Sequence, residues 1–276
     1  MRSVLTALLL FPLSMKAQFY YHDIMGVQET NNQFKTYKAL SVTRVSATAY
    51  NENNLPDAAF SENQVINTAE NYIRTTTINS GTTSNEISYF DAEGRISRSV
   101  DSSSSLLTTT TYRYDAAGRI LQMTNTLTDT VANISETETH QWLYDADGAP
   151  LKMIRVINNT DSTEFRLKKD EDGNIIEETT YKRNRPGEVV YYYYNDNNLL
   201  SDIVRFNTKA QRLLPDFMFE YDAEGRVIQK ITTLSNNKIG YIIWRYKYDE
   251  RGLKVKEADY DKEKRLIGRI DYSYSF

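Results

Sequence analysis

The sequence predicts an all-β chain, an extended and twisted antiparallel sheet of β-hairpin repeats with one short N-terminal helix. The first observation is a turn-like stretch at 221–227, versions of which recur along most of the 276 residues. The second is composition, because 21 tyrosines and abundant threonine favour strands and only 5 prolines interrupt them. The third is frequent alternation with a period of two, beside a near absence of long helical periodicity.

The stretch Tyr221–Val227 has the chemistry of a hairpin turn. Asp222 suits the first position of a type I turn, since its carboxylate accepts hydrogen bonds from backbone amides just ahead. Gly225 supplies the positive φ that lets the second strand leave in register. Arg226 lies across the turn from Asp222, where an exposed ion pair would contribute about 0–1 kcal/mol. The stretch is therefore predicted to join two antiparallel strands.

Related stretches place a glycine or an asparagine at positions 94, 118, 148, 173, 198, 225 and 252, which are 24 to 30 residues apart. Each interval holds two strands and two turns, so the pattern predicts up-and-down hairpins. The predicted structural turn residues are Asp91, Gly94, Asp115, Gly118, Asp145, Gly148, Asp170, Gly173, Asn198, Asp222, Gly225, Asp249 and Gly252.

Other turns are less regular. A degenerate copy is predicted at Tyr50–Leu55, with Asn54 in the glycine position, followed by a strand at 72–78 and a turn at Ser80-Gly81. Turns on the opposite edge are predicted at residues 101–105, 129–133, 158–161, 185–187, 209–212 and 236–237.

The first 17 residues have the organisation of a secretory signal peptide. Arg2 supplies the charged region, and residues 4–13 are apolar but too short to span a bilayer. Cleavage is predicted between Ala17 and Gln18, although Met15 is large for its position and leaves a site one or two residues away as an alternative. An uncleaved anchor is the other alternative. We expect an exported protein, whether periplasmic, surface-associated or secreted.

Composition narrows the class of protein. There is no cysteine, which excludes both a disulfide framework and a lipid-modified cysteine anchor. Removal of Arg2 and Lys16 leaves 31 of the 33 basic residues against 37 acidic residues, a net charge of −6. This balance argues against nucleic acid as the main partner. No later apolar run approaches the ~20 residues that a membrane helix needs.

Residues 18–40 differ from the rest of the chain. Thr30 and Gln33 fit a capping box, which predicts one helix over about residues 31–39 with Phe34 and Tyr37 on one face. We expect this helix to cover one end of the sheet. The predicted organisation is a signal peptide at 1–17, an N-terminal segment with a short helix at 18–40 and a hairpin-repeat domain at 41–276.

The pattern Tyr-Asp-x-x-Gly-Arg, complete at Tyr114–Arg119 and Tyr221–Arg226 and nearly so at Phe90–Arg95, resembles the YD-repeat (Rhs-type) family. The resemblance covers roughly residues 85–260. It implies β-hairpin sheets that can wrap into hollow shells, with toxin domains in some members and carbohydrate binding at cell surfaces in others. We count only about seven or eight copies in this chain, too few to enclose much, and expect no appended toxin or protease-like segment.

No motif indicates catalysis, a metal or a cofactor. The turns at 145–148 and 170–173 resemble calcium loops but lack an acidic residue at the twelfth position, so repeat turns are the simpler interpretation. His22 and His140 are not spaced as a metal pair. There is no Gly-x-Ser-x-Gly elbow and no phosphate loop, although a Ser–His–Asp set stays open in a chain this rich in serine and aspartate. We expect a non-enzymatic protein.

Aromatic rows are the candidate ligand-binding residues. Trp244, Tyr246 and Tyr248 share one face of a predicted strand, and Trp142 and Tyr144 share a face of another. Rows of this kind stack on sugar rings or anchor a protein partner. The alternative is that they are core pairs of the sheet, each contributing about 0.2–1 kcal/mol.

We therefore expect an exported binding or scaffold module of the cell envelope that is not integral to the membrane, whose partner is an unidentified protein or glycan. Two alternatives stay open. One is an outer-membrane β-barrel, favoured by the alternation of Ile270, Tyr272, Tyr274 and Phe276. The other is an unrecognised hydrolase.

Overall fold

The computed structural model describes residues 18–234 and 240–276, so the predicted signal peptide at 1–17 and the predicted turn at 236–237 lie outside the described residues. The chain divides into two compact units. The helix unit comprises the described residues up to Ser46, together with Ser61–Glu188 and Tyr274–Phe276. The C-terminal unit comprises Ala47–Phe60 and the described part of Val189–Ser273.

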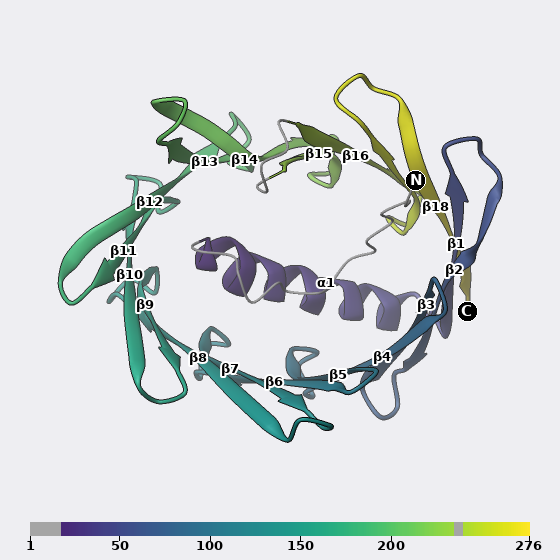
Figure 1. Cartoon of the computed structure of the whole chain (residues 1–276), viewed down its shortest axis with the longest axis horizontal. Coiled ribbons are helices and arrows are strands. Elements are labelled where there is room, and N and C mark those ends of the chain that lie inside the picture. The colour runs from purple at the N-terminus through teal and green to yellow at the C-terminus, as the bar shows by residue number, and fades with distance from the viewer. Residues whose placement is uncertain (1–17, 235–239) are drawn as a thin grey trace. The chain divides into compact units, whose positions relative to one another are not determined.

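Strands dominate both units (Figure 1). The first eleven are β1 Arg44–Asn51, β2 Pro56–Asn67, β3 Tyr72–Asn79, β4 Thr82–Phe90, β5 Ile96–Ser103, β6 Leu106–Tyr114, β7 Ile120–Asp129, β8 Ile134–Tyr144, β9 Pro150–Ile157, β10 Asp161–Lys169 and β11 Ile175–Lys182. The others are β12 Arg185–Tyr194, β13 Leu200–Asn207, β14 Arg212–Tyr221, β15 Val227–Thr233, β16 Tyr241–Tyr248, β17 Lys254–Tyr260 and β18 Leu266–Ser275.

Consecutive strands pair antiparallel from β3 to β11 in the helix unit. The same holds from β12 to β18 in the C-terminal unit. The predicted all-β class, built from antiparallel hairpins with an N-terminal helix, is confirmed.

Each repeat turn is a type I turn followed by a bulge. At the opening stretch, the Gly225 amide donates to the Asp222 carbonyl at 3.1 Å, and the strand register shifts between Glu220 and Tyr221. Gly225 has a φ of 77°, the left-handed conformation that this bulge requires. Asn198, in the glycine position of a degenerate copy, reaches the same region with a φ of 60°.

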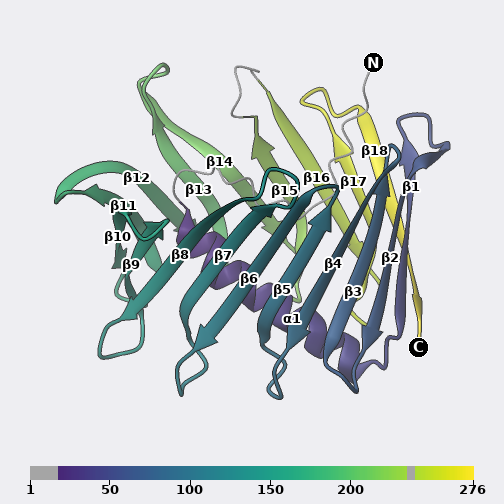
Figure 2. The ribbon, with the colours of Figure 1, turned by 60° about the horizontal axis from the view of Figure 1, so that its bottom comes forward.

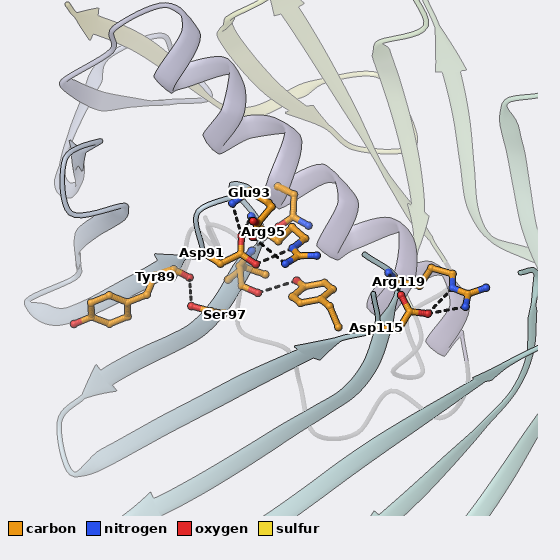
Figure 3. Close-up of polar contacts among 10 residues, drawn as sticks. Tyr89, Asp91, Glu93, Arg95, Ser97, Asp115 and Arg119 are labelled. Carbon is orange, nitrogen blue, oxygen red and sulfur yellow. Dashed lines mark hydrogen bonds and ion pairs between the residues drawn. The ribbon is translucent and has the colours of Figure 1, made fainter. Parts of the chain in front are cut away.

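An aspartate holds each complete turn closed. Asp222 Oδ1 accepts hydrogen bonds from the amides of Glu224 (3.2 Å) and Arg226 (2.8 Å), and Oδ2 accepts one from Arg226 Nε at 2.7 Å. Burial acts to raise the pKa of Asp222, but the amide and guanidinium of Arg226 outweigh it and lower that pKa. We call this arrangement the turn clasp. Figure 3 shows two further copies, Asp91 with Arg95 and Asp115 with Arg119.

The tyrosine of the repeat ties each clasp to the next one. The Tyr248 hydroxyl donates to the Val227 carbonyl at 2.8 Å, and the Arg226 guanidinium lies 4.9 Å from the centre of the Tyr248 ring. This is hydrogen-bond and cation–π geometry. Equivalent contacts join Tyr114 to Ile96 and Arg95, and Tyr144 to Ile120 and Arg119. The Tyr-Asp-x-x-Gly-Arg pattern therefore links successive hairpins as well as shaping turns.

One turn of the same kind escaped the sequence prediction. Asp261 accepts hydrogen bonds from the Arg265 amide and guanidinium at 2.9 and 2.7 Å, on the edge opposite the regular turns. Lys264 occupies the glycine position with a φ of 61°. The preceding Tyr260-Asp261 pair was the available signal, but lysine in the glycine position concealed it.

The turn predicted at 185–187 is wrong. The chain reverses at Arg183-Asn184, where φ is 49° and 60°, and β12 already begins at Arg185. Two consecutive left-handed residues form the two-residue turn whose twist matches that of the flanking strands. Asparagine tolerates this conformation, whereas Pro186 and Gly187 lie within the strand.

The N-terminal helix is longer than predicted. A π-helical segment, η1 (Tyr20–Met25), leads directly into α1 (Gly26–Ala39), whereas the prediction began near residue 31. Thr30 is not the N-cap, because its hydroxyl donates back to the Gly26 carbonyl within the helix. Among the described residues no helix is long and apolar enough to cross a membrane.

The helix crosses a face of the sheet in its unit, so the prediction that it covers one end of the sheet is wrong (Figures 1 and 2). Phe34 is fully buried and stacks on Phe90 of β4 at 3.9 Å between ring centres. At the other end, Phe19 packs against Phe165 of β10 at 4.6 Å. A helix with apolar side chains at both ends needs an apolar surface along its length, which a sheet edge does not offer.

A buried polar cluster fixes the start of this helix to β8. Asp23, 1% exposed, lies 2.7 Å from His140 Nδ1 and accepts a hydrogen bond from Trp142 Nε1 at 3.0 Å. His140 Nε2 lies 2.7 Å from Glu138. Burial alone would lower the pKa of His140, but the two carboxylates outweigh it and raise the pKa to about 9. His140 is therefore an imidazolium at neutral pH, held between two anions.

The first prediction concerns the turn clasp. Asp222→Ala should lower the free energy of unfolding by about 1 kcal/mol, because it removes two backbone hydrogen bonds and the ion partner of Arg226. Asp222→Asn is the matched control, since Asn195 keeps both backbone bonds in its own turn with an amide oxygen. Urea unfolding measures both variants. Equal losses would contradict the role assigned to the backbone bonds.

The second prediction concerns pH. The folded-state pKa of His140, about 9, exceeds the ordinary value of 6.5. The stabilisation is therefore complete below pH ~6.5 and is lost as the pH rises through about 9, by at most about 3 kcal/mol. Urea unfolding at several pH values measures this loss. His140→Gln should be less stable at pH 6 and should lose the pH dependence. A native chain whose stability is constant over this range would refute the cluster's charge state.

Candidate ligand-binding face

Strand β16 brings the predicted aromatic row to one face of the C-terminal unit. Alternation along the strand puts Trp244, Tyr246 and Tyr248 on that face, while Arg245 and Lys247 lie on the other. Trp244 is half-buried. Within residues 18–234 and 240–276, no hydrogen bond reaches its indole nitrogen. Trp244 thus keeps an indole N–H and part of its ring available to a ligand.

Two acidic side chains stand directly across from this row. In the β16–β17 ladder, Trp244 is opposite Asp259 and Tyr246 is opposite Glu257. Both carboxylates are on residues only 4% exposed. We call Trp244, Tyr246, Glu257 and Asp259 the aromatic–acidic face. Directly opposed residues lie about 4.5–5.5 Å apart at Cβ, close enough for one small ligand to touch both members of a pair.

Glu257 already has a cationic partner. Lys254 Nζ donates to Glu257 Oε2 at 2.8 Å, and the Tyr272 hydroxyl donates to the same oxygen at 3.4 Å. The Lys254 ammonium also lies 5.4 Å from the Tyr246 ring centre and 5.0 Å from that of Tyr272. Tyr272 in turn packs against a small apolar core of Ala47, Ala49, Phe60 and Ile270. These contacts make this part of the face rigid.

Asp259 has a different environment. Among the described residues it has no ion-pair partner. Burial raises the pKa of Asp259 to about 6, the charge of Glu257 acts in the same direction, and the backbone amides of Asp259 and Gly268 only partly oppose them. At neutral pH it is therefore a mostly ionised, poorly hydrated acceptor beside an aromatic ring. A ligand hydroxyl group could donate a hydrogen bond to the Asp259 carboxylate.

The other predicted ligand-binding residues have structural contacts. Trp142 is 2% exposed, and its indole N–H donates to Asp23. The hydroxyls of Tyr144 and Tyr248 donate to backbone carbonyls of the preceding repeat, and an arginine lies over each ring. The structure thus brings only Trp244 and Tyr246, of the five predicted residues, together with the acidic pair.

The sequence analysis did not predict Glu257 and Asp259 as site residues. The available signal was their spacing of two in Lys254–Tyr260, which puts both on one face of a strand. The register that sets them against Trp244 and Tyr246 follows from the hairpin turn at Asp249–Gly252 and its bulge between Lys247 and Tyr248. The turn was predicted, but the pairs that it places opposite one another were not.

Of the two turns that resembled calcium loops, the one at 145–148 carries a lysine instead. Lys169 Nζ lies 2.8 Å from Asp145 Oδ2 and 3.4 Å from Asp147 Oδ2. The Lys169 ammonium, with the backbone amides of the turn, keeps the pKa of Asp145 below its ordinary value. No group of three or more potential metal ligands from His, Cys, Asp and Glu gathers in the described parts of the chain.

Comparisons with known proteins bear on the repeat. A family model of the RHS repeat matches residues 90–130. A comparison with curated proteins gives no match. Among solved structures, the chain is similar to a porin-like protein from Bacteroides uniformis, with 9% identity and a TM-score of 0.40 over 85% of this chain and 98% of that one.

Toxin components that contain TccC3 are also similar. The complex TcdB2-TccC3 without its hypervariable C-terminal region gives 15% identity and a TM-score of 0.35, over 76% of this chain and 11% of that one. The Photorhabdus luminescens Tc holotoxin pore gives 14% identity and a TM-score of 0.35, over 77% and 11%. This chain therefore spans about a tenth of the length of the two toxin chains.

The family match begins at Phe90, the last residue of β4, and includes the clasps at Asp91–Arg95 and Asp115–Arg119, which Figure 3 shows. The resemblance predicted from the Tyr-Asp-x-x-Gly-Arg pattern is thus confirmed, and residues 90–130 match the RHS repeat.

Proposed function

We propose that this chain is an exported, non-enzymatic repeat protein of the cell envelope that binds carbohydrate on its aromatic–acidic face. The observation that carries the proposal is the direct opposition of Trp244 to Asp259 and of Tyr246 to Glu257 across two strands. A sugar ring offers C–H groups to an aromatic face and hydroxyl donors to a carboxylate. Alternating aromatic and acidic side chains suit that combination.

The charges favour a neutral sugar with a free hydroxyl donor over an acidic one. Lys254 neutralises Glu257, whereas Asp259 keeps its charge and has no cation beside it within the described residues. A ligand carboxylate would therefore meet the Asp259 anion in a poorly hydrated place, where like charges repel strongly. A hydroxyl group would instead give Asp259 a hydrogen-bond donor in addition to the backbone amides of Asp259 and Gly268.

Export and the absence of catalysis form part of the same proposal. The signal peptide predicted at 1–17 supports export, and a chain without cysteine needs no disulfide for its stability in any redox compartment. The clasps make a rigid series of hairpins, which is suited to display a binding face. Glu257 is engaged by Lys254 and Tyr272, an arrangement that serves positioning rather than proton transfer.

The third prediction tests the aromatic side of the face. The glycan that the native mature chain selects from an array should bind Trp244→Ala at least about tenfold more weakly in calorimetry, a loss of about 1.4 kcal/mol or more. Tyr241→Ala is the matched control, because Tyr241 is an exposed aromatic of the same strand on the opposite face. No selected glycan, equal affinities of both variants, or turnover of the glycan would count against the proposal.

The fourth prediction separates binding from stability. Because the folded-state pKa of Asp259, about 6, exceeds its ordinary 3.8, its carboxylate lowers stability as the pH rises through that range. Asp259→Asn should therefore have a higher urea midpoint at pH 7. Its free energy of unfolding should exceed that of the native chain by about 1–3 kcal/mol. The same variant should bind the selected glycan more weakly. A variant that is less stable yet binds normally would show that Asp259 serves the fold alone.

A further inference from the structure

A buried carboxylate accepts hydrogen bonds from the backbone amides of the first three described residues. Glu178 of β11 is fully buried, on the face that carries Phe165. Its Oε1 accepts hydrogen bonds from the amides of Gln18 (2.9 Å) and Phe19 (3.1 Å), and its Oε2 accepts one from Tyr20 at 2.9 Å. These are amides at a helix start, which have no partner within the helix itself. Glu178 therefore caps the helix from a residue 160 positions away.

Gln18 differs in two features from the other described non-glycine residues that have a positive φ, since it is buried and its φ is the largest. It is only 3% exposed, and its φ is 81°. The left-handed region costs a residue with a Cβ roughly 1–2 kcal/mol, and glutamine lacks the short side chain that helps asparagine there. The φ torsion is defined by the bond to the preceding residue. When Gln18 is the first residue, that torsion no longer exists and the strain disappears.

The predicted signal-peptide cut falls at this same residue, between Ala17 and Gln18. We propose that Glu178 is a built-in receptor for the α-ammonium group of Gln18, which forms when the signal peptide is removed. The inference rests on the proposed export. It also fixes the cleavage site, because a cut elsewhere would put a different group at the carboxylate.

Cleavage changes what Glu178 binds. Water adds across the Ala17–Gln18 peptide bond: its oxygen joins the Ala17 carbonyl carbon, which leaves as a carboxylate, and the Gln18 nitrogen takes up protons to become an ammonium. One neutral N–H donor is thereby replaced by a cation with several donors, at the 2.9 Å position beside Oε1. A charge-assisted hydrogen bond is roughly twice as strong as a neutral one, and an opposite charge offsets the cost of burying a carboxylate.

Docking of the whole helix start follows from this contact. Phe19 packs on Phe165, and Asp23 binds His140 and Trp142 within the next turn. The ammonium–carboxylate pair would therefore tighten these contacts only in the processed chain. Export and final packing of the helix unit become coupled, because the charged N-terminus arises after the signal peptide has left.

The fifth prediction first identifies the N-terminus. Intact-mass and N-terminal sequence analysis of the protein taken from native cells should give Gln18 with a free amine. A different first residue, or Gln18 cyclised with loss of ammonia to a neutral lactam, would overturn the inference. Recovery of uncut chain from the cytoplasm would instead overturn the proposed export, and the following test would still judge the Glu178 site.

The second measurement uses mature chain released from a removable fusion directly before Gln18. The rate of N-terminal acylation at pH 7 should rise at least tenfold in Glu178→Gln. Glu177→Gln is the matched control, since Glu177 lies on the opposite face of β11, and it should leave the rate unchanged. A second test does not depend on Glu178→Gln folding correctly. A chain with Gly-Ser added before Gln18 keeps Glu178 but moves the ammonium group away from it. This chain should have a lower urea midpoint than the mature chain. The Glu178 site would be overturned if Glu178→Gln were acylated at the same rate as the mature chain and the Gly-Ser chain had the same urea midpoint as the mature chain.

Discussion

The Asp–Arg–Tyr interaction of the turn clasp is the constraint on which the rest of the structure depends. The aspartate shapes its own turn through backbone amides, the arginine leaves the turn to lie on the next tyrosine ring, and that tyrosine returns to a carbonyl of the preceding hairpin. None of these contacts is strong alone, since exposed ion pairs and cation–π contacts each contribute about 1 kcal/mol or less. Their repetition at Asp91, Asp115 and Asp222 adds several modest contributions in a chain that has no disulfide.

This division of labour explains which aromatic residues are available for binding. Tyrosines directly before a turn aspartate are used by the clasp, so Tyr144 and Tyr248 are structural. Trp142 is used by the helix unit, where it helps to bury Asp23. Trp244 takes part neither in a turn clasp nor in the contact with the helix. It stands opposite an aspartate that lacks a cation in the described parts of the chain, and this difference between the two tryptophans is the basis of the proposed function.

How far the sequence could predict the structure follows from the range of each interaction. The turns were predictable because Asp222, Gly225 and Arg226 act within five residues. The opposite-edge turn at Arg183-Asn184 was not, because the adjacent Pro186-Gly187 carries a stronger local turn signal. The start of the helix depends on Glu178, and the charge of His140 depends on Asp23, 117 residues away. Such pairs leave no local pattern. The register that sets Asp259 against Trp244 differs from them, because it follows from the predicted turn at Asp249–Gly252 and its bulge.

Nuclear magnetic resonance can test directly whether Trp244 binds the ligand while Trp142 is structural. The chain has only 2 tryptophans and therefore two indole N–H signals. The measurement is a titration of ¹⁵N-labelled mature protein with the glycan that it selects, following both signals. We expect the Trp244 signal to shift in a saturable way, while that of Trp142, whose indole N–H donates to Asp23, stays in place. A Trp244 signal that does not move at saturating glycan would contradict binding at the aromatic–acidic face, as would a shift confined to Trp142.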